Sequence, residues 1–363
     1  MKSLSIAEQN KHLEGVSRTF ALTIPCLPED LRDWVGNAYL LCRIADTIED
    51  DPRMDIAAKK KYLSEFAGIL SAPLHVDEWT RDICARVADS ATAAENLLMK
   101  DIPLVIGRYC LYPAEVQKII RRGVVIMCKG MAQIERWNNI DSLDEVDHYC
   151  YSVAGVVGEI LANLFAEHSP AIKKKLPELS PLAVSFGEAL QLTNILKDVW
   201  DDARRGARWL PIANSDPEQR QEATKKYVAV ALGHAMQALQ FIKLLPRSER
   251  GIRKFCLLAA EMAVMTLRNI HENPLFREPK EIKISHSDVR NCVLMTFFCA
   301  SSNLLLDLLF SHLSGKEMKP EFRDPAELMN KVSFWNSNNA YEYKPVQNDP
   351  SSNELSEECK NDY

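Results

Sequence analysis

Residues 34–51 read WVGNAYLLCRIADTIEDD, a proline-free run of apolar and helix-forming residues. At about 100° per residue along an α-helix, four polar side chains of this stretch fall within an arc of about 60°. They are Tyr39, Arg43, Asp46 and Asp50. The rest of the helix surface is apolar, which predicts a buried helix. Because an unpaired buried charge is costly, the polar row is expected to face a partner or a water-filled cavity.

A second stretch repeats this construction. Residues 188–202 read EALQLTNILKDVWDD, and one row of polar side chains spans about 80° of the expected helix. The row consists of Gln191, Asn194, Asp198 and Asp202. The flanking positions are again apolar. Glu49 and Asp201 add a further carboxylate beside each row.

Facing carboxylates repel one another unless cations lie between them. Hard divalent cations take oxygen ligands, and Mg²⁺ usually keeps water and binds substrate phosphates as well. The two rows therefore predict a site that holds a diphosphate through Mg²⁺. The alternative is that each row is a solvated helix end, neutralised by bases such as Arg43 and Arg204. The duplication of the pattern favours the metal–diphosphate interpretation.

The placement of proline predicts an all-α fold. The 18 prolines leave long intervals filled with good helix formers, and proline is excluded from helix interiors. Alternating strand patterns and fixed-period repeats are absent from the sequence. We expect roughly eight to ten helices in one bundle over residues 1–319. Residues 320–363 are rich in Asn, Ser and Glu and are expected to form a polar, mobile tail.

Composition excludes several functions. The net charge is −6, so no overall positive field exists to attract nucleic acid. The 13 glycines are about half the usual share, which argues against glycine-rich nucleotide loops. The ten cysteines form no C-x-x-C pair and predict free thiols in a reducing compartment.

The distribution of apolar residues predicts a cytoplasmic protein. The N-terminal stretch lacks the continuous apolar run of a signal peptide. The longest apolar segment, residues 292–313, is interrupted by Asn303 and Asp307. This segment is therefore expected to be a buried helix rather than a transmembrane span.

Several motifs together resemble the squalene/phytoene synthase family. The match covers roughly residues 10–315, in the order that the family shows. The motifs are SRTF (17–20), DTIED (46–50), YCYSVAGVVG (149–158) and QLTNILKDVWDD (191–202). The resemblance implies an all-α isoprenoid-synthase fold around a central cavity.

Two further segments favour the squalene synthases within this family. FCLLAAEMA (255–263) is similar to their Phe-Cys block, and EIKIS (281–285) resembles a stretch that contacts NADPH there. Ser285 departs from that pattern, because a basic residue is expected at its position. Residues 198–206 are closer to the phytoene-synthase version. The hydrophobic C-terminal anchor of the eukaryotic enzymes has no counterpart in this sequence, so the chain looks like a soluble, bacterial-type member.

The resemblance implies that two farnesyl diphosphates are joined through presqualene diphosphate, which NADPH then reduces to squalene. Mg²⁺ and NADPH are the implied cofactors, and peripheral contact with a membrane is implied for release of the product. Three alternatives remain: a dehydrosqualene- or phytoene-type synthase, a presqualene diphosphate synthase, and a non-catalytic assembly factor of the same fold.

Residue roles follow from the same resemblance. Tyr149 is the candidate for proton transfer, with Tyr39 assisting. The expected metal ligands are Asp46, Glu49, Asp50, Asn194, Asp198 and Asp202. The expected substrate contacts are Ser17, Arg18, Arg43, Gln191, Asn194 and Phe255. NADPH is expected to contact Arg18, Arg43 and Lys283. The candidates for the apolar lining are Phe20, Met127, Met131, Phe186, Phe255, Met262 and Met265.

Overall fold

The structure of the chain is a computed structural model that describes residues 2–137, 140, 142–204, 209–210 and 216–337; for Arg18 it describes only the backbone. Within these ranges the chain is helical and contains no strand, as the sequence predicts. The α-helices are α1 (Ile6–Val16), α2 (Arg18–Thr23), α3 (Glu29–Glu49), α4 (Ile56–Ser71), α5 (Val76–Val87), α6 (Ala93–Lys100), α7 (Ile102–Tyr109), α8 (Ala114–Met131), α9 (Ile134–Trp137), α10 (Leu143–Cys150), α11 (Val156–His168), α12 (Pro170–Lys173), α13 (Leu176–Arg204), α14 (Pro217–Leu244), α15 (Arg250–Glu272), α16 (His286–Cys299), α17 (Asn303–Ser314) and α18 (Pro325–Val332). Short turns add η1 (Ile24–Cys26), the π-helical η2 (Tyr151–Gly155) and η3 (Pro279–Ile282).

The helices are more numerous than the roughly eight to ten expected from proline spacing. Several proline-free intervals hold two helices, because side-chain caps begin a new helix without a proline. Thr92 accepts a hydrogen bond from the Glu95 backbone N–H and starts α6 in this way. The opposite departure occurs in α13, which begins at Leu176 and continues through Pro181. Pro181 lies in the second turn of α13, so the helix begins before the proline-free part of its sequence.

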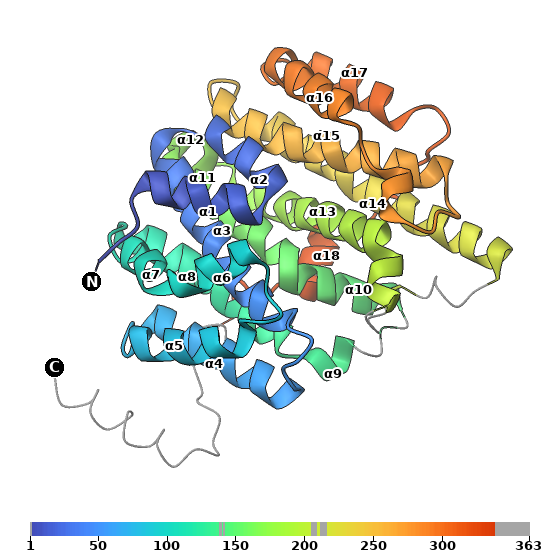
Figure 1. Cartoon of the computed structure of the whole chain (residues 1–363). Helices are drawn as coiled ribbons and strands as arrows, with labels where there is room; N and C mark the ends of the chain where they lie inside the picture. Colours follow the sequence, from blue (N-terminus) through green and yellow to red (C-terminus); the bar gives the residue numbers. More distant parts are fainter. Residues whose placement is uncertain (1, 138–139, 141, 205–208, 211–215, 338–363) are drawn as a thin grey trace.

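The long helix α13 runs through the middle of the bundle and packs against α11, α14, α15 and α18 (Figure 1). Glycine permits the closest of these approaches. A Cβ atom on Gly158 would lie 2.0 Å from the carbonyl oxygen of Ala183, and one on Gly187 would lie 2.2 Å from that of Ala154. Close packing is therefore the role of this glycine pair in α11 and α13. It brings two of the motif-bearing helices together.

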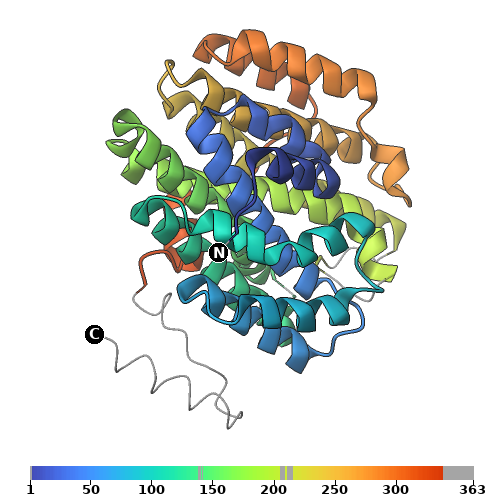
Figure 2. The same ribbon diagram turned by 60° about the vertical axis from the view of Figure 1, so that its left-hand side comes forward.

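The apolar segment at 292–313 differs from the expected buried helix. It forms two helices, α16 and α17, separated by a turn at Ala300–Ser302. Both lie on α15 at the edge of the molecule (Figures 1 and 2). Only their inner sides are buried, through Cys292, Thr296 and Cys299 in α16 and Leu306, Leu309 and Phe310 in α17. The apolar content of the segment predicts one buried helix; it shows neither the break at Ala300–Ser302 nor that the outer side of each helix lacks a partner within the described residues.

The first part of the expected tail is packed against the body. Arg323 donates a hydrogen bond to the buried Asp147 at 2.5 Å, and α18 lies against α13 and α10. Trp335 is buried and lies 5.7 Å from the guanidinium of Arg122. The folded body thus extends at least to Ser337, beyond the boundary expected at residue 320. Residues 338–363, the rest of that segment, lie outside the described residues.

One continuous helix, Leu143–His168, is long and apolar enough to cross a membrane, and it is the one such helix among the described residues. It comprises α10, η2 and α11. The surrounding helices bury 67% of its apolar window. Nine of the ten cysteines fall in the described ranges, and all nine are free thiols, as expected.

Candidate active site

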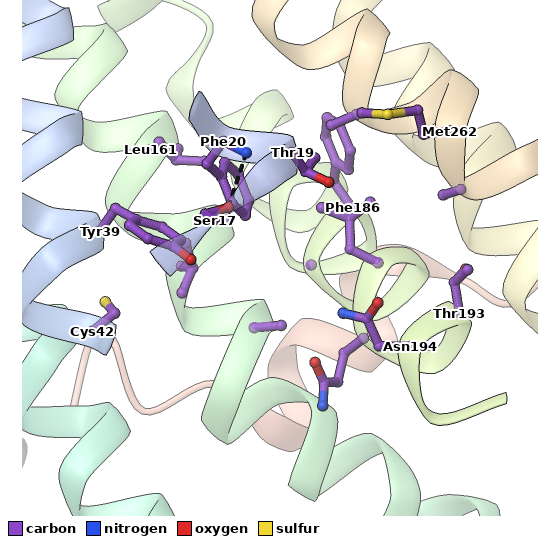
Figure 3. Close-up of a pocket in the computed structure, with 18 of the residues that line it drawn as sticks. Ser17, Thr19, Phe20, Tyr39, Cys42, Leu161, Phe186, Thr193, Asn194 and Met262 are labelled. Carbon is purple, nitrogen blue, oxygen red and sulfur yellow. Dashed lines mark hydrogen bonds between the residues drawn. The ribbon is translucent and has the colours of Figure 1, made fainter. Parts of the chain in front are cut away.

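A cavity of about 860 Å³ lies between α2, α3, α11, α13 and α15 (Figure 3). Its size is near the upper end of the range of about 300–1,000 Å³ typical of ligand sites. Five of the seven side chains proposed as apolar lining contribute to it: Phe20, Met127, Phe186, Phe255 and Met262. Met131 and Met265 are not among the lining residues. The walls are mainly apolar, so the cavity suits a hydrocarbon chain.

Both polar rows reach this cavity. Tyr39, Arg43 and Asp46 line it from α3, and Gln191 and Asn194 line it from α13. The two helices predicted to face one another therefore do so across one apolar chamber. The rows differ in extent, because the lining includes neither Asp50 nor Asp198 and Asp202.

The carboxylates of α3 are close enough to influence one another. Enclosure by the protein raises the pKa of Asp46 to about 7; Arg43 opposes this, and the charge of Asp50 adds to it. Burial raises the pKa of Glu49 to about 8, and the charges of Asp50 and Asp46 contribute. Crowded carboxylates of this kind are stabilised as anions when a cation binds among them.

The α13 row divides into two parts. Asp198 is partly exposed and lies 3.2 Å from the ammonium of Lys197, and Asp201 forms an ion pair with Arg204. The last turn of α13 therefore resembles the solvated helix end that was the alternative interpretation. The preceding turn, with Asn194 and Gln191, lines the cavity instead.

The donor set fits a hard divalent cation. Asp46 supplies a carboxylate at the cavity, Asn194 supplies an amide oxygen, and Glu49 and Asp50 stand beside Asp46. No group of three His, Cys, Asp or Glu residues close enough to hold a metal occurs in the described part of the chain. Mg²⁺ does not require one, since it binds through one or two carboxylates together with water and substrate phosphate.

Basic side chains accompany the acids. Arg43 lies between two carboxylates, 3.9 Å from Asp46 and in a short ion pair with Glu95. Lys197, Lys280 and Lys283 also line the cavity. The sequence interpretation includes Arg43 and Lys283 but omits Glu95, Lys197 and Lys280. Glu95 also closes the capping box of α6, and no local pattern indicates its contact with Arg43.

Tyr149 is buried between two tryptophan rings. Its ring stacks on Trp209 with centroids 4.0 Å apart and meets Trp137 edge-on at 5.6 Å. Burial raises its pKa well above the usual value, and the charges of Glu49 and Asp50 add to the shift. The phenol is therefore protonated at neutral pH. Neither tryptophan belongs to a motif identified in the sequence.

The remaining expected residues are placed as follows. Ser17 lines the cavity and caps α2, accepting a hydrogen bond from the Phe20 backbone N–H at 3.0 Å. Tyr39 lies beside the Phe20 ring, with centroids 4.9 Å apart. The side chain of Arg18 lies outside the described part of the structure. Ser285 caps α16 and accepts a hydrogen bond from the Asp288 backbone N–H at 3.1 Å, which gives this serine a structural use.

These features define an all-α protein with a mainly apolar chamber whose wall also carries acids, amides and bases. That combination suits apolar chains with a diphosphate at one end. The chain belongs to the squalene/phytoene synthase family, whose model matches residues 13–288. Members of this family are prenyltransferases of isoprenoid biosynthesis, and the resemblance read from the motifs is confirmed.

Individual relatives agree with this assignment. A probable squalene synthase from Neurospora crassa is 29% identical over 334 residues, covering 87% of this chain and 66% of that protein. A squalene synthase from Candida albicans is 29% identical over 284 residues, covering 72% and 61%. The chain thus spans about three fifths to two thirds of the length of these relatives.

Solved structures establish the fold. A complex of TcSQS with the ligand E5700 matches with a TM-score of 0.68 and 21% identity, covering 90% of this chain and 96% of that one. A dehydrosqualene synthase in complex with a ligand matches with a TM-score of 0.55 and 18% identity, covering 80% and 95%. The predicted squalene synthase-like helical fold is therefore confirmed.

Proposed function

We propose that the protein joins two farnesyl diphosphates head to head through presqualene diphosphate and, with NADPH, reduces that intermediate to squalene. The observation that carries this proposal is the single apolar cavity faced by Asp46 of α3 and by Asn194 and Gln191 of α13. The apolar part of its lining suits the farnesyl chains, and the polar side chains among the lining residues suit the diphosphate. We further propose a cytoplasmic protein that contacts a membrane peripherally.

The acidic residues have the role of holding Mg²⁺. We assign Asp46, Glu49 and Asp50 on α3, and Asn194, Asp198 and Asp202 on α13, as its ligands directly or through water. When bound, Mg²⁺ supplies positive charge that stabilises the departing diphosphate. Without a cation, the raised pKa values of Asp46 and Glu49 favour their protonated forms.

The basic side chains bind the phosphate groups of substrate and cofactor. Guanidinium groups match phosphate oxygens in a forked geometry, which fits Arg43 at the cavity wall and gives Arg18 the same proposed role. Lys283 and its neighbour Lys280 line the cavity close to the start of α16 and are the proposed NADPH contacts. NADPH supplies hydride to the intermediate when bound.

Tyr149 is proposed to handle the proton lost when the cyclopropane ring forms. Its raised pKa keeps the phenol protonated, so we assign it the role of a proton relay rather than of a phenolate base. A carbocation needs little basicity to lose a proton, and the released diphosphate accepts it. Tyr39, Ser17 and Phe255 line the cavity. We assign Tyr39 and Ser17 an assisting role through hydrogen bonds, and Phe255 a contact with the farnesyl chain.

One observation favours a second candidate. Ser285 is used as a helix cap at the position where a basic residue is expected to contact NADPH. A synthase that completes the condensation without reduction, giving dehydrosqualene, therefore stands as the alternative product specificity.

The deciding experiment supplies purified protein with farnesyl diphosphate and Mg²⁺, with and without NADPH, and identifies the products by mass. We expect pyrophosphate release to require Mg²⁺, and squalene to form only with NADPH. Dehydrosqualene in the presence of NADPH would establish the second candidate, and accumulation of presqualene diphosphate would indicate a first-half enzyme. Absence of any turnover or diphosphate binding would indicate a non-catalytic member of the fold.

A further inference from the structure

Two consecutive helices carry most of the large apolar side chains that the described chain exposes. Eight of the fifteen lie on α16 and α17: Val293, Leu294, Met295, Phe297, Phe298, Leu304, Leu305 and Leu308. We call these eight the outer apolar face. Phe297, Phe298 and Leu304 are each exposed over more than 60% of their surface. Scattered single apolar residues are normal on a protein surface, but a gathering of this size marks a binding surface.

The exposure is not a result of loose packing. Thr296 on the inner side of α16 donates a hydrogen bond to the buried carboxyl of Glu261 at 2.9 Å. The fully buried Arg253 donates to the Ala300 carbonyl and, at 2.7 Å, to the Asn303 side chain, which fixes the turn between the two helices. The outer apolar face is therefore held in place by polar contacts beneath it.

Basic groups border this face. The ammonium of Lys254 on α15 lies 3.9 Å from the centre of the Phe297 ring, and Arg250, the first residue of the same helix, and Arg247, just before it, are exposed. Arg290 is exposed one turn before Leu294 on α16. The one acid within the face, Asp307, is paired with Lys243 at 2.7 Å. Lys254, Arg250 and Arg290 therefore place cations beside this face that can bind anionic phosphate groups, although Glu249 and Asp288 lie on the same segments.

The same helices adjoin the cavity. Phe255, Ala259 and Met262 line it from α15, and α16 packs against α15. Val289 of α16 also lines the cavity, one turn before Val293 of the outer apolar face. If the proposed function holds, a hydrocarbon leaving along α16 arrives at this face.

We propose that α16 and α17 lie on an anionic lipid bilayer, with the outer apolar face among the acyl chains and the basic border at the phosphates. Leu, Phe and Met beside Lys and Arg form the pattern of a helix that lies in the plane of a membrane interface. Residues 338–363 contain only two large aliphatic side chains, Val346 and Leu355, and so are poorly suited to cover the face themselves. The docking surface rests on exposure and charge alone; only its use as an exit depends on the proposed function.

The test measures cosedimentation of the full chain with vesicles, without substrate. We expect binding to phosphatidylcholine vesicles that contain a quarter phosphatidylglycerol, and binding at least tenfold weaker to pure phosphatidylcholine or at high salt. The variant Phe297→Ser/Phe298→Ser/Leu304→Ser is expected to lose binding at least tenfold. The matched control Leu74→Ser/Leu97→Ser/Leu111→Ser changes three exposed leucines elsewhere and should bind like the parent.

Thermal unfolding and light scattering complete the design. Because the substituted side chains are exposed, both triple variants are expected to melt like the parent protein. Absence of vesicle binding by the parent, or unchanged binding by the Phe297/Phe298/Leu304 variant, would overturn the proposal. So would a dimer that this variant alone dissociates, since the face would then join two copies. Because no turnover is measured, these outcomes are independent of the product assay.

Discussion

Tyr149 shows how a residue can be identified from sequence while its environment cannot. The family motif at residues 149–158 indicates this tyrosine, but Trp209 and Trp137, which hold its ring, come from segments without a recognised pattern. Its position near Glu49 and Asp50 follows from the packing of α10 against the chain around it. The proposed role of Tyr149 in proton transfer depends on its hydroxyl group alone, so a substitution that removes only this group tests it.

We expect Tyr149→Phe to lower kcat by about 10²–10⁴, the usual contribution of a positioned proton-transfer group. The phenyl ring retains the stacking contact, so the melting temperature should change little. Steady-state kinetics with farnesyl diphosphate and a thermal melt provide the measurements. Tyr109→Phe, which removes a hydrogen bond to the Gln117 carbonyl at 3.2 Å, serves as the control and should keep its activity. Full activity of Tyr149→Phe would exclude the proposed role.

Helical spacing predicts which side chains of one helix share a row, and it does so correctly for Tyr39, Arg43 and Asp46. It says nothing about partners that arrive from other elements, such as Glu95 of α6 or Lys280 of η3. It also does not show where a row leaves the cavity, as the α13 row does after Asn194.

At the scale of elements, the segment after Gly315 acts as a clamp on the helix that carries Tyr149. Arg323 pairs with the buried Asp147, two residues before Tyr149, and Lys331 pairs with Asp144. On the next turns, the Tyr151 hydroxyl donates to Glu159 at 2.8 Å and accepts from the Phe334 backbone N–H at 3.0 Å. This segment is polar in sequence, and its function as a clamp depends on charges that are far apart along the chain.

Arg323→Met should lower the free energy of unfolding by up to about 3 kcal/mol, because the buried Asp147 would keep only the more distant ammonium of Lys331, 3.6 Å away, as a charged partner. Denaturant titration gives this value. Replacing both partners, as Arg323→Met/Asp147→Leu, should recover much of the loss, since no buried charge then remains. Equal instability of the single and double variants would contradict this account. A fall in kcat with unchanged KM in the double variant would indicate that the clamp positions Tyr149.

Glu261 of α15 is a buried acid that accepts a hydrogen bond from Thr296 of α16 at 2.9 Å. Burial raises its pKa to about 8, so in the folded protein it is protonated at neutral pH. The folded state then binds more protons than the unfolded state between about pH 4.5 and pH 8, and stability falls as the pH rises through this range. Glu261→Gln preserves a hydrogen-bond acceptor for Thr296 and should remove that part of the pH dependence. Unfolding midpoints from pH 5 to pH 9 provide the measurement; parallel curves for parent and variant would contradict the assignment.

The elements themselves were partly predictable. Proline spacing identifies the helical class but misses helix breaks made by capping residues such as Thr92 and Ser302. The apolar content of residues 292–313 predicts a helical segment, but burial depends on whether another helix covers it. The sequences of α16 and α17 alone do not indicate that the outer side of these helices is exposed.

At the scale of the whole molecule, the all-α class and the meeting of α3 and α13 at one cavity were predictable, because buried rows of charge must face a common space. The other walls of the cavity were not predictable from the sequence. The cavity is completed by α2, α11 and α15, which come together only in the folded bundle. A ligand that spans this cavity should therefore stabilise the molecule as a unit.

We expect a non-cleavable farnesyl thiodiphosphate to raise the melting temperature only when Mg²⁺ is present. A ligand at about 100 times its Kd stabilises the folded state by about 2.7 kcal/mol. For a chain of this length, this corresponds to a rise of a few degrees. Asp46→Asn removes a proposed Mg²⁺ ligand and should abolish the shift, whereas Asp89→Asn, at an exposed ion pair with Arg53, should preserve it. Mg²⁺-independent stabilisation, or a full shift in Asp46→Asn, would mean that the diphosphate is held by the basic side chains alone.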